Sequence, residues 1–152
     1  MDIEIVAEGL GFAEGPVEMP NGDIVTVDVR GGRIMRSQAD GSTREIASPG
    51  GGPNGAAIGP DGALYVVNNG GFPWSERSGL LIPVDENGST RPPNFEGGWV
   101  DRIDPETGDI NRLFDGLDGE RFLGPNDIVF DQSGGFWFTD LGKSDSRSMD
   151  RG

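Results

Sequence analysis

Three side chains that carry oxygen occupy the same place in a repeated segment of this chain: Glu14, Asn54 and Asn126. Each begins a fifteen-residue frame, and the repetition suggests sheet units whose starts converge on one point. Glu14 and Asn126 are suitable ligands for a hard divalent cation such as calcium, which takes carboxylate and amide oxygens. Glu14 could instead be a solvated turn residue, and Asn126 could cap its own turn. Asn54 could equally make structural hydrogen bonds or line a shared channel.

The composition narrows the chemistry, because the 152 residues include no histidine and no cysteine. This excludes Ser-His-Asp and Cys-His catalysis, histidine-bound zinc or iron, and disulfides. Only oxygen ligands remain for a metal, which favours calcium, magnesium or manganese over zinc or copper. The acidic side chains could collect such a cation, although acidity alone is more typical of a soluble surface.

The net charge of −14 also bears on partners, because an acidic surface repels phosphate backbones. Nucleic acid is therefore not expected as a partner. The sequence shows no apolar run long enough to cross a membrane and no basic, apolar leader at its start. We therefore expect a cytoplasmic protein with no membrane partner.

Each frame predicts a β-hairpin. The ninth position is always glycine (Gly22, Gly62 and Gly134), as expected for a tight turn. The β-branched and aromatic segments that follow, 24–27, 64–67 and 136–139, are typical of strands buried on both faces. The last position holds Asp28, Asn68 or Asp140. We expect Asp28 and Asn68 to bind backbone amides, whereas Asp140 could serve either the backbone or a site.

The spacing of the frames predicts an all-β protein, specifically a β-propeller. The first two frames start 40 residues apart, at 14 and 54, which is the size of a four-stranded blade. Outer hairpins are expected at 33–36 with 43–46 and at 99–103 with 109–113. The domain is thus a partial propeller over 1–152, with the following parts: blade one over about 12–48, blade two over about 52–115, the start of blade three over 124–142, and a strand over 2–7 that completes the last blade.

An insert over 69–98 separates the two halves of blade two. It is too long for a simple connection, so it is a functional lid or a disordered segment. Its aromatic residues Phe72, Trp74 and Phe95 favour a packed lid. The third frame has no outer hairpin after it. We therefore expect a longer protein, or a second half-propeller chain or homodimer that closes the ring.

The chain resembles the senescence marker protein/gluconolactonase family of regucalcin-like lactonases. The resemblance depends on several signatures in a fixed order, of which each alone is weak: Phe12-Ala-Glu-Gly-Pro16, Pro53-Asn-Gly55 with Pro60-Asp-Gly62, Gly124-Pro-Asn-Asp-Ile-Val-Phe-Asp131, and Gly135-Phe-Trp-Phe-Thr-Asp140. The resemblance implies a six-bladed β-propeller that binds a divalent cation, usually calcium, and hydrolyses a small lactone.

The resemblance also implies roles for particular residues. Glu14 matches a metal ligand, and Asn126 with Asp127 matches a pair at the active site, where the asparagine lies near metal or substrate. Arg121 is the candidate for an arginine that contacts substrate, although a surface cation is the more common role. Asn54 and Asp140 are added as candidates for contact with the lactone. Two further ligands, an asparagine and the aspartate that serves as general base, are expected beyond residue 152.

Two functions therefore remain open. One is metal-dependent hydrolysis of a sugar-type lactone to the hydroxy acid. The other is a non-catalytic propeller that binds calcium or protein, or a truncated chain without activity of its own.

Overall fold

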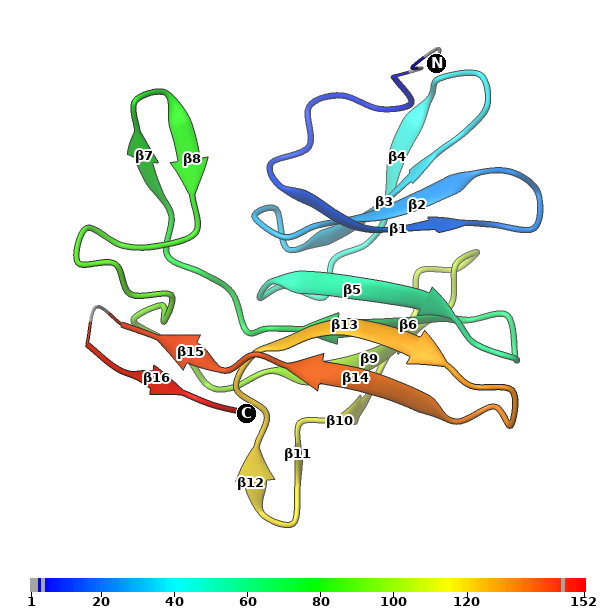
Figure 1. The fold of residues 1–152 in the computed structure, drawn as a ribbon. Coiled ribbons are helices and arrows are strands. Elements are labelled where there is room, and N and C mark those ends of the chain that lie inside the picture. Colours follow the sequence, from blue (N-terminus) through cyan, green and yellow to red (C-terminus); the bar gives the residue numbers. More distant parts are fainter. Residues whose placement is uncertain (1–2, 4, 146) are drawn as a thin grey trace.

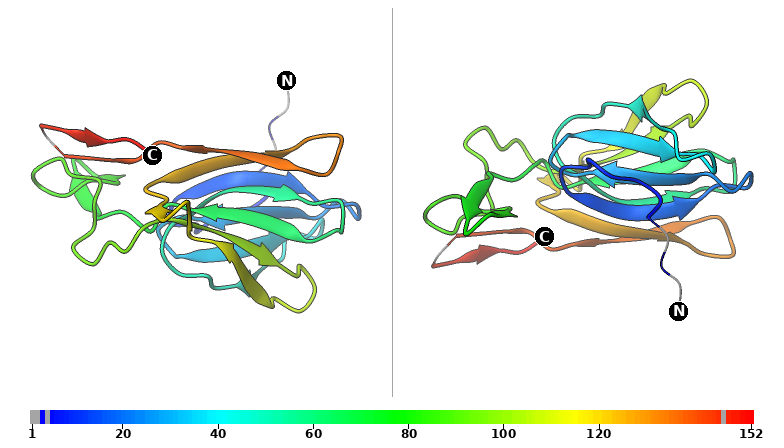
Figure 2. Two further views of the ribbon diagram at one scale, coloured as in Figure 1. Left: turned by 90° about the horizontal axis from the view of Figure 1, so that it is seen from below. Right: turned by 90° about the horizontal axis from the view of Figure 1, so that it is seen from above.

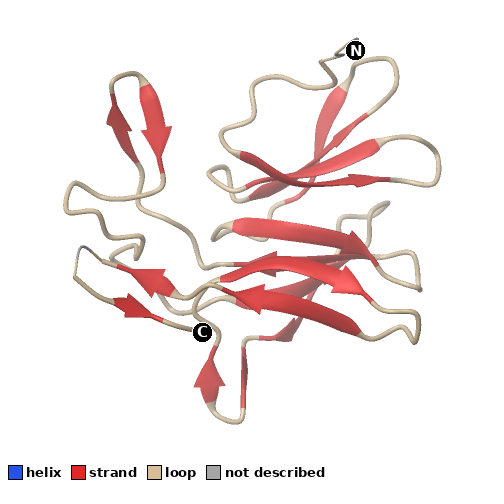
Figure 3. Cartoon of the chain, in the orientation of Figure 1, coloured by secondary structure: helices blue, strands red, loops and turns tan. Residues whose placement is uncertain are grey.

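The computed structural model describes residues 3, 5–145 and 147–152, and these residues form sixteen strands and no helix (Figure 3). Within this described part no segment meets the requirements of a membrane-spanning helix. The strands are antiparallel throughout, and the two largest sheets have four strands each. The all-β prediction is confirmed.

Blade one is a four-stranded meander in which each strand pairs with the next along the chain. Its strands are β1 (Ala13–Glu18), β2 (Ile24–Asp28), β3 (Arg33–Ser37) and β4 (Thr43–Ala47). The turn between β1 and β2 is closed by two backbone hydrogen bonds, from Met19 N to Asp23 O and from Gly22 N to Met19 O, both 2.8 Å long. Gly22 has a φ of 85°, a conformation that residues with a side chain rarely adopt. The recurring glycine at position nine is thus required by the turn.

Blade two has the same order of pairing, with the insert between its second and third strands. Its strands are β5 (Pro53–Ile58), β6 (Leu64–Asn68), β9 (Trp99–Ile103) and β10 (Ile110–Phe114). The insert over 69–98 contains a short hairpin, β7 (Ser75–Arg77) with β8 (Leu80–Ile82). The outer hairpins predicted for both blades are confirmed to within one residue.

Blade three is represented by one hairpin, β13 (Pro125–Phe130) with β14 (Phe136–Asp140). Small hairpins flank it: β11 (Gly116–Leu117) with β12 (Glu120–Arg121), and β15 (Lys143–Ser144) with β16 (Met149–Asp150). The prediction that 136–139 is buried on both faces is wrong, because Trp137 is 70% exposed. Phe136 and Phe138 pack toward blade two, whereas no described strand covers the opposite face.

The core lies within and between the blades. Buried aliphatic side chains of β2, β3, β6 and β9 form it, among them Val25, Ile34, Leu64 and Ile103, all with no exposed surface. A second cluster joins blade two to the third hairpin, where the Tyr65 ring packs edge-on against Phe130 with centroids 4.9 Å apart. This packing fixes the position of one blade against the next.

The innermost strands β1, β5 and β13 lie side by side, with β5 in the middle, and they run in the same direction (Figure 1). Their starts therefore lie at one end of the molecule. The insert and the segment after residue 140 project together at that end (Figure 2). This end is where a shared site can form.

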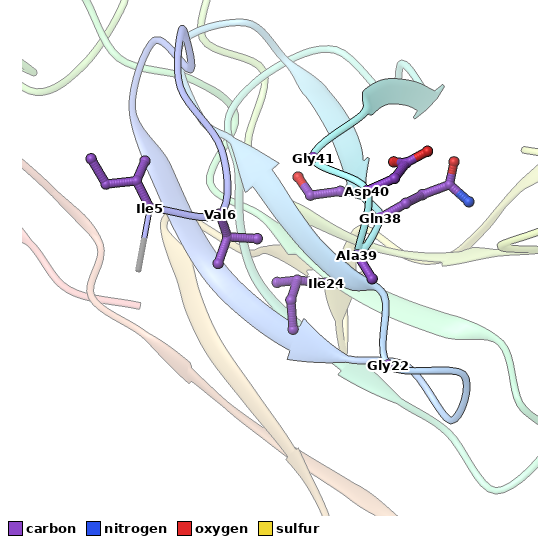
Figure 4. Close-up of a pocket in the computed structure, with 9 residues that line it drawn as sticks. Ile5, Val6, Gly22, Ile24, Gln38, Ala39, Asp40 and Gly41 are labelled. Carbon is purple, nitrogen blue, oxygen red and sulfur yellow. The ribbon is translucent and has the colours of Figure 1, made fainter. Parts of the chain in front are cut away.

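The segment before blade one leaves a hollow of about 460 Å³ beside the blade, lined in part by Ile5, Val6 and Ile24 (Figure 4). None of the predicted site residues lines this hollow. Residues 3 and 5–7 lie in no strand, and residues 2 and 4 are outside the described part of the chain. The strand expected over 2–7 stays a prediction, since the blade it would complete is not part of this chain.

Candidate active site

Two of the predicted residues meet directly. The Asn54 side chain donates a hydrogen bond from Nδ2 to Oδ1 of Asn126 over 3.4 Å, across the gap between blades two and three. Gly55 makes this approach possible, because a Cβ there would lie 2.7 Å from the backbone oxygen of Asn126. The two amides therefore face each other where adjacent inner strands begin.

A β-bulge lies at the start of each inner strand. The register shifts by one residue between Glu14 and Val17 in β1, between Pro53 and Ala56 in β5, and between Pro125 and Ile128 in β13. A bulge redirects side chains locally, and such irregularities are common beside active sites. The bulge in β5 includes Asn54 and that in β13 includes Asn126, so both asparagines are freed from the regular in–out alternation of their strands.

Glu14 occupies the corresponding place on β1, next to Asn54. A Cβ on the neighbouring Gly15 would lie 2.6 Å from the backbone oxygen of Asn54, so the two strands touch at this point. The Glu14 side chain is exposed, whereas Asn54 and Asn126 are half-buried. Glu14, Asn54 and Asn126 thus stand on three adjacent inner strands at the same end, as the repeated frame predicts.

A pocket of about 170 Å³ lies at this end, and both asparagines line it. The insert contributes Asn69, Phe72 and Thr90 to its walls, and Lys143 lies on the side of the third hairpin. The insert packs against the segment after β14: Thr90 N donates to Ser144 O, and Ser144 N donates to Thr90 Oγ1, both over 2.8 Å. The insert therefore forms a wall of the pocket. Of the two alternatives, a packed or a disordered segment, the structure shows the packed one.

The residues at position fifteen of the frames share one structural task, which is to hold the loop that leads into the inner strand of the same blade. Asp28 accepts hydrogen bonds from Phe12 N and Gly31 N. Asn68 Oδ1 accepts one from Gly52 N over 2.8 Å, and its Nδ2 donates to Gly50 O. The prediction for Asp28 and Asn68 is confirmed.

Asp140 acts in the same way. Its carboxylate accepts hydrogen bonds from Leu123 N, Gly124 N and Gly142 N at 2.6 to 2.9 Å. These contacts position the loop before Asn126. A direct contact between Asp140 and substrate stays a prediction.

Asp28 also pairs with Arg33, whose Nε lies 3.0 Å from its carboxylate. Burial opposes ionisation of this carboxyl group, but the backbone amides and Arg33 outweigh it and lower its pKa below the ordinary value. Asp28 is therefore an anion that is held in place by its surroundings rather than a group prepared for acid–base chemistry.

Two further candidates lie outside the pocket. Arg121 is exposed on β12 and donates a hydrogen bond to the backbone oxygen of Glu96, so it holds the insert. Asp127 is exposed, accepts a hydrogen bond from Ile128 N, and lines a separate apolar hollow with Val129 and Trp137. Contacts of Arg121 and Asp127 with substrate stay predictions.

Lys143 is a residue of the pocket that the sequence did not indicate. It is 2% exposed, and its Nζ donates a hydrogen bond to Gly71 O over 2.7 Å. The ammonium group also lies 4.2 Å from the centre of the Phe72 ring and 5.1 Å from that of Phe95. The pKa of Lys143 is lowered to about 7, chiefly by burial and to a smaller extent by Arg91, while Asp140 opposes the change. A lysine after a strand is ordinarily solvated, so no sequence signal marked it.

The described residues contain no group of three His, Cys, Asp or Glu side chains that could hold a metal ion. At the starts of the inner strands, Glu14, Asn54 and Asn126 offer one carboxylate and two amide groups. Such oxygen donors suit a hard cation in kind, but calcium takes six to eight of them. These three residues could therefore supply only part of a coordination shell.

Comparison with known proteins assigns the family. The sequence profile of the SMP-30/gluconolactonase/LRE-like region matches residues 12–152. A gluconolactonase from Zymomonas mobilis subsp. mobilis (strain ATCC 31821 / ZM4 / CP4) is 27% identical over 168 aligned positions, which cover 97% of this chain and 40% of that protein. The chain thus spans well under half of this curated relative.

A solved structure shares the fold. The gluconolactonase XC5397 from Xanthomonas campestris superposes with a TM-score of 0.65 at 20% sequence identity, over 90% of this chain and 37% of that one. The two four-stranded sheets and the β13–β14 hairpin are accordingly two blades and the start of a third in a β-propeller. With its profile match over nearly all of its length, the chain belongs to the SMP-30/gluconolactonase/LRE-like family.

Proposed function

We propose that the protein, with its ring completed, hydrolyses a sugar-type lactone to the hydroxy acid. The observation that carries this proposal is the meeting of Asn54 and Asn126 at a pocket on the end where the inner strands begin. Family membership supports the same reaction class, since the relatives described above are gluconolactonases. Because the chain spans only part of those relatives, activity is proposed for the completed ring.

The proposal includes a divalent cation held in part by Glu14 and Asn126, with calcium expected and magnesium or manganese as alternatives. The exposed carboxylate of Glu14 and the amide oxygen of Asn126 are oxygen donors of the right kind. When bound, such a cation polarises a lactone carbonyl and lowers the pKa of a bound water. The remaining ligands and the general base would come from outside residues 1–152.

The residues of this chain hold and orient the substrate in this proposal. The hydrogen bond from Asn54 Nδ2 holds the amide oxygen of Asn126 in place. Asp140 holds the backbone just before Asn126 through Leu123 N and Gly124 N. Phe72 and the buried Lys143 stem exclude water from one side of the pocket.

Completion of the ring requires a further blade against the third hairpin. Val129 and Trp137 are 61% and 70% exposed on the outer face of this hairpin. In blade two, Tyr65 has the same frame position as Trp137, and it packs on Phe130 of the next blade. We therefore assign the Val129–Trp137 face to contact with the next propeller blade, carried by the same polypeptide, by a second half-propeller chain or by a second copy.

The test is the proton release that accompanies hydrolysis of D-glucono-δ-lactone, with and without EDTA, in a preparation whose native mass corresponds to a closed ring. We expect an EDTA-sensitive rate above the spontaneous one, which calcium restores. Asn126→Ala should reduce this rate by about 10- to 100-fold. The matched control is Asn111→Ala, on the exposed strand β10, which should leave it unchanged.

A closed ring with no metal-dependent rate would overturn the hydrolase proposal. Calorimetric titration with calcium chloride separates the alternatives at that point. Calcium binding without hydrolysis would favour a non-catalytic calcium-binding propeller.

A further inference from the structure

The pocket wall contains a buried side-chain donor that pairs with no acceptor in the described part of the chain. Asn69 is 2% exposed, and its Nδ2 has no hydrogen-bond acceptor among the described residues. Buried polar groups are nearly always paired, so an unpaired one calls for an explanation. Asn69 lines the pocket that contains Asn54 and Asn126.

The orientation of the Asn69 amide is fixed by its neighbours. Its Oδ1 accepts a hydrogen bond from Gly71 N over 2.8 Å, and its own backbone N donates to Gly52 O over 2.9 Å. Exchange of the amide oxygen and nitrogen would place two donors against each other at Gly71. The NH2 group is therefore the end without an acceptor.

Lys143 holds the loop that carries Asn69. Its Nζ donates to the carbonyl of Gly71, the same residue whose N–H fixes the Asn69 amide. The Phe72 and Phe95 rings lie against the ammonium group and keep it from other partners. A continuous path of contacts thus runs from Lys143 through Gly71 to the unpaired donor.

We propose that Asn69 binds an oxygen of the bound lactone through its side-chain N–H, and that Lys143 is the positioning residue which holds it there. This inference rests on the proposed function and names a substrate-binding residue for it. A hydroxyl, ring or carbonyl oxygen supplies the missing acceptor. The ligand must therefore present an oxygen acceptor to Asn69, as a sugar-type lactone does.

The test uses the closed-ring protein and two probes, D-glucono-δ-lactone for kinetics and D-gluconate for binding by calorimetry. Asn69→Asp is nearly isosteric and keeps the acceptor for Gly71 N, but it replaces the donor by an anionic oxygen. We expect KM to rise and gluconate affinity to fall by about tenfold, the effect of losing one hydrogen bond. The control is Thr26→Val, because Thr26 Oγ1 in blade one is also buried without a partner but lies outside the pocket. It should leave both quantities unchanged.

Lys143→Met tests the positioning role, since methionine keeps contact with the rings and loses the donor. We expect faster hydrogen–deuterium exchange over residues 69–72 with the blade strands unchanged, a raised KM, and partial rescue in Lys143→Arg. If Lys143 acts through Asn69, the double variant Asn69→Asp/Lys143→Met should be no worse than Asn69→Asp alone.

Each outcome decides the inference. An unchanged KM and gluconate affinity in Asn69→Asp, in a protein that hydrolyses the lactone, would overturn the role of Asn69 and leave the hydrolase proposal standing. Additive effects in the double variant would overturn the role of Lys143. A parent protein that neither hydrolyses the lactone nor binds gluconate would overturn both proposals.

Discussion

Gly55 offers a sharp test of how the blades bring Asn54 and Asn126 together. The substitution Gly55→Ala places a Cβ 2.7 Å from both the backbone oxygen of Asn126 and the Cα of Asp127. Ordinary van der Waals contact begins at 3.4 Å, so the space is short by 0.7 Å (3.4 − 2.7). The obstructing atoms are backbone, so no side-chain rotation can relieve the clash. Strands β5 and β13 must separate.

The size of the effect follows from two opposing contributions. Overpacking a tightly fitted contact costs about 1–3 kcal/mol, and alanine recovers about 0.5–1 kcal/mol of the chain entropy that glycine loses in a strand. The difference leaves a range of about 0–2.5 kcal/mol, and because the obstructing atoms are backbone, we expect a net loss of about 1–2 kcal/mol of unfolding free energy. The φ of Gly55 is not positive, so the loss reports the clash and not backbone strain.

The assay is urea unfolding of the 152-residue chain, followed by tryptophan emission. Gly135→Ala is the matched control: Gly135 also lacks a positive φ, and the nearest atoms to its Cβ belong to the exposed Asp131 side chain, at 3.1 Å. This control should stay within about 0.5 kcal/mol of the parent. Equal unfolding midpoints for Gly55→Ala and Gly135→Ala would show that the inner strands are not in tight contact at Asn126.

Three further predictions concern other parts of the chain. Asp28→Asn should cost about 1.5–3 kcal/mol, because an amide NH2 would face the Arg33 guanidinium. The parent should lose this contribution as the pH falls below the ordinary aspartate pKa of about 3.9, since the folded pKa of Asp28 is lowered. Urea unfolding midpoints of the parent and Asp28→Asn at pH 7 and pH 3 measure this loss. The same stability difference between the two proteins at both pH values would contradict it. With the pKa of Lys143 lowered from 10.5 to about 7, the unfolded chain binds more protons between these values. The unfolding free energy should therefore rise with pH over that window, by at most about 1.4 kcal/mol per pH unit, and Lys143→Met should lose this rise. Parallel plots of unfolding free energy against pH for the parent and Lys143→Met would refute this prediction. Iodide should quench tryptophan emission more strongly in the isolated chain than in its Trp137→Phe variant, because Trp137 is exposed. Quenching of Trp137 should decrease once the ring is closed. Equal quenching in both states would exclude the Val129–Trp137 face as the contact with the next blade.

The sequence was sufficient to predict the blades, because the spacing of the frames and the turn residues can be recognised from local sequence patterns. Gly22, Gly62 and Gly134 mark turns that need a positive φ, and the apolar segments that follow them form β2, β6 and β14. Trp137 was misjudged, because its segment has the composition of a strand buried on both faces. Burial depends on the neighbouring blade, which the composition of one strand does not reveal.

The site was predictable only where it repeats. Alignment of the repeated fifteen-residue frames indicated that Asn54 and Asn126 occupy equivalent positions, and the structure brings them into contact. Asn69 and Lys143 lie outside the frames and reach the pocket through the packing of the insert against the segment after β14. No periodic signal encodes such a contact, so both residues were missed. Gly55 was the available sign of the bulge, since glycine inside a strand often marks one.

The repeated bulge has a consequence for how such blades can diverge. In a regular strand, exchanging one residue type for another alters the packing of the face on which it sits. Here the first frame position lies inside the interruption of the pleat for Asn54 and Asn126 and at its edge for Glu14. These residues can therefore differ in chemistry while the valines and leucines behind them keep their places. Copies of one ancestral hairpin could thus acquire separate tasks at a common centre without any redesign of their interiors.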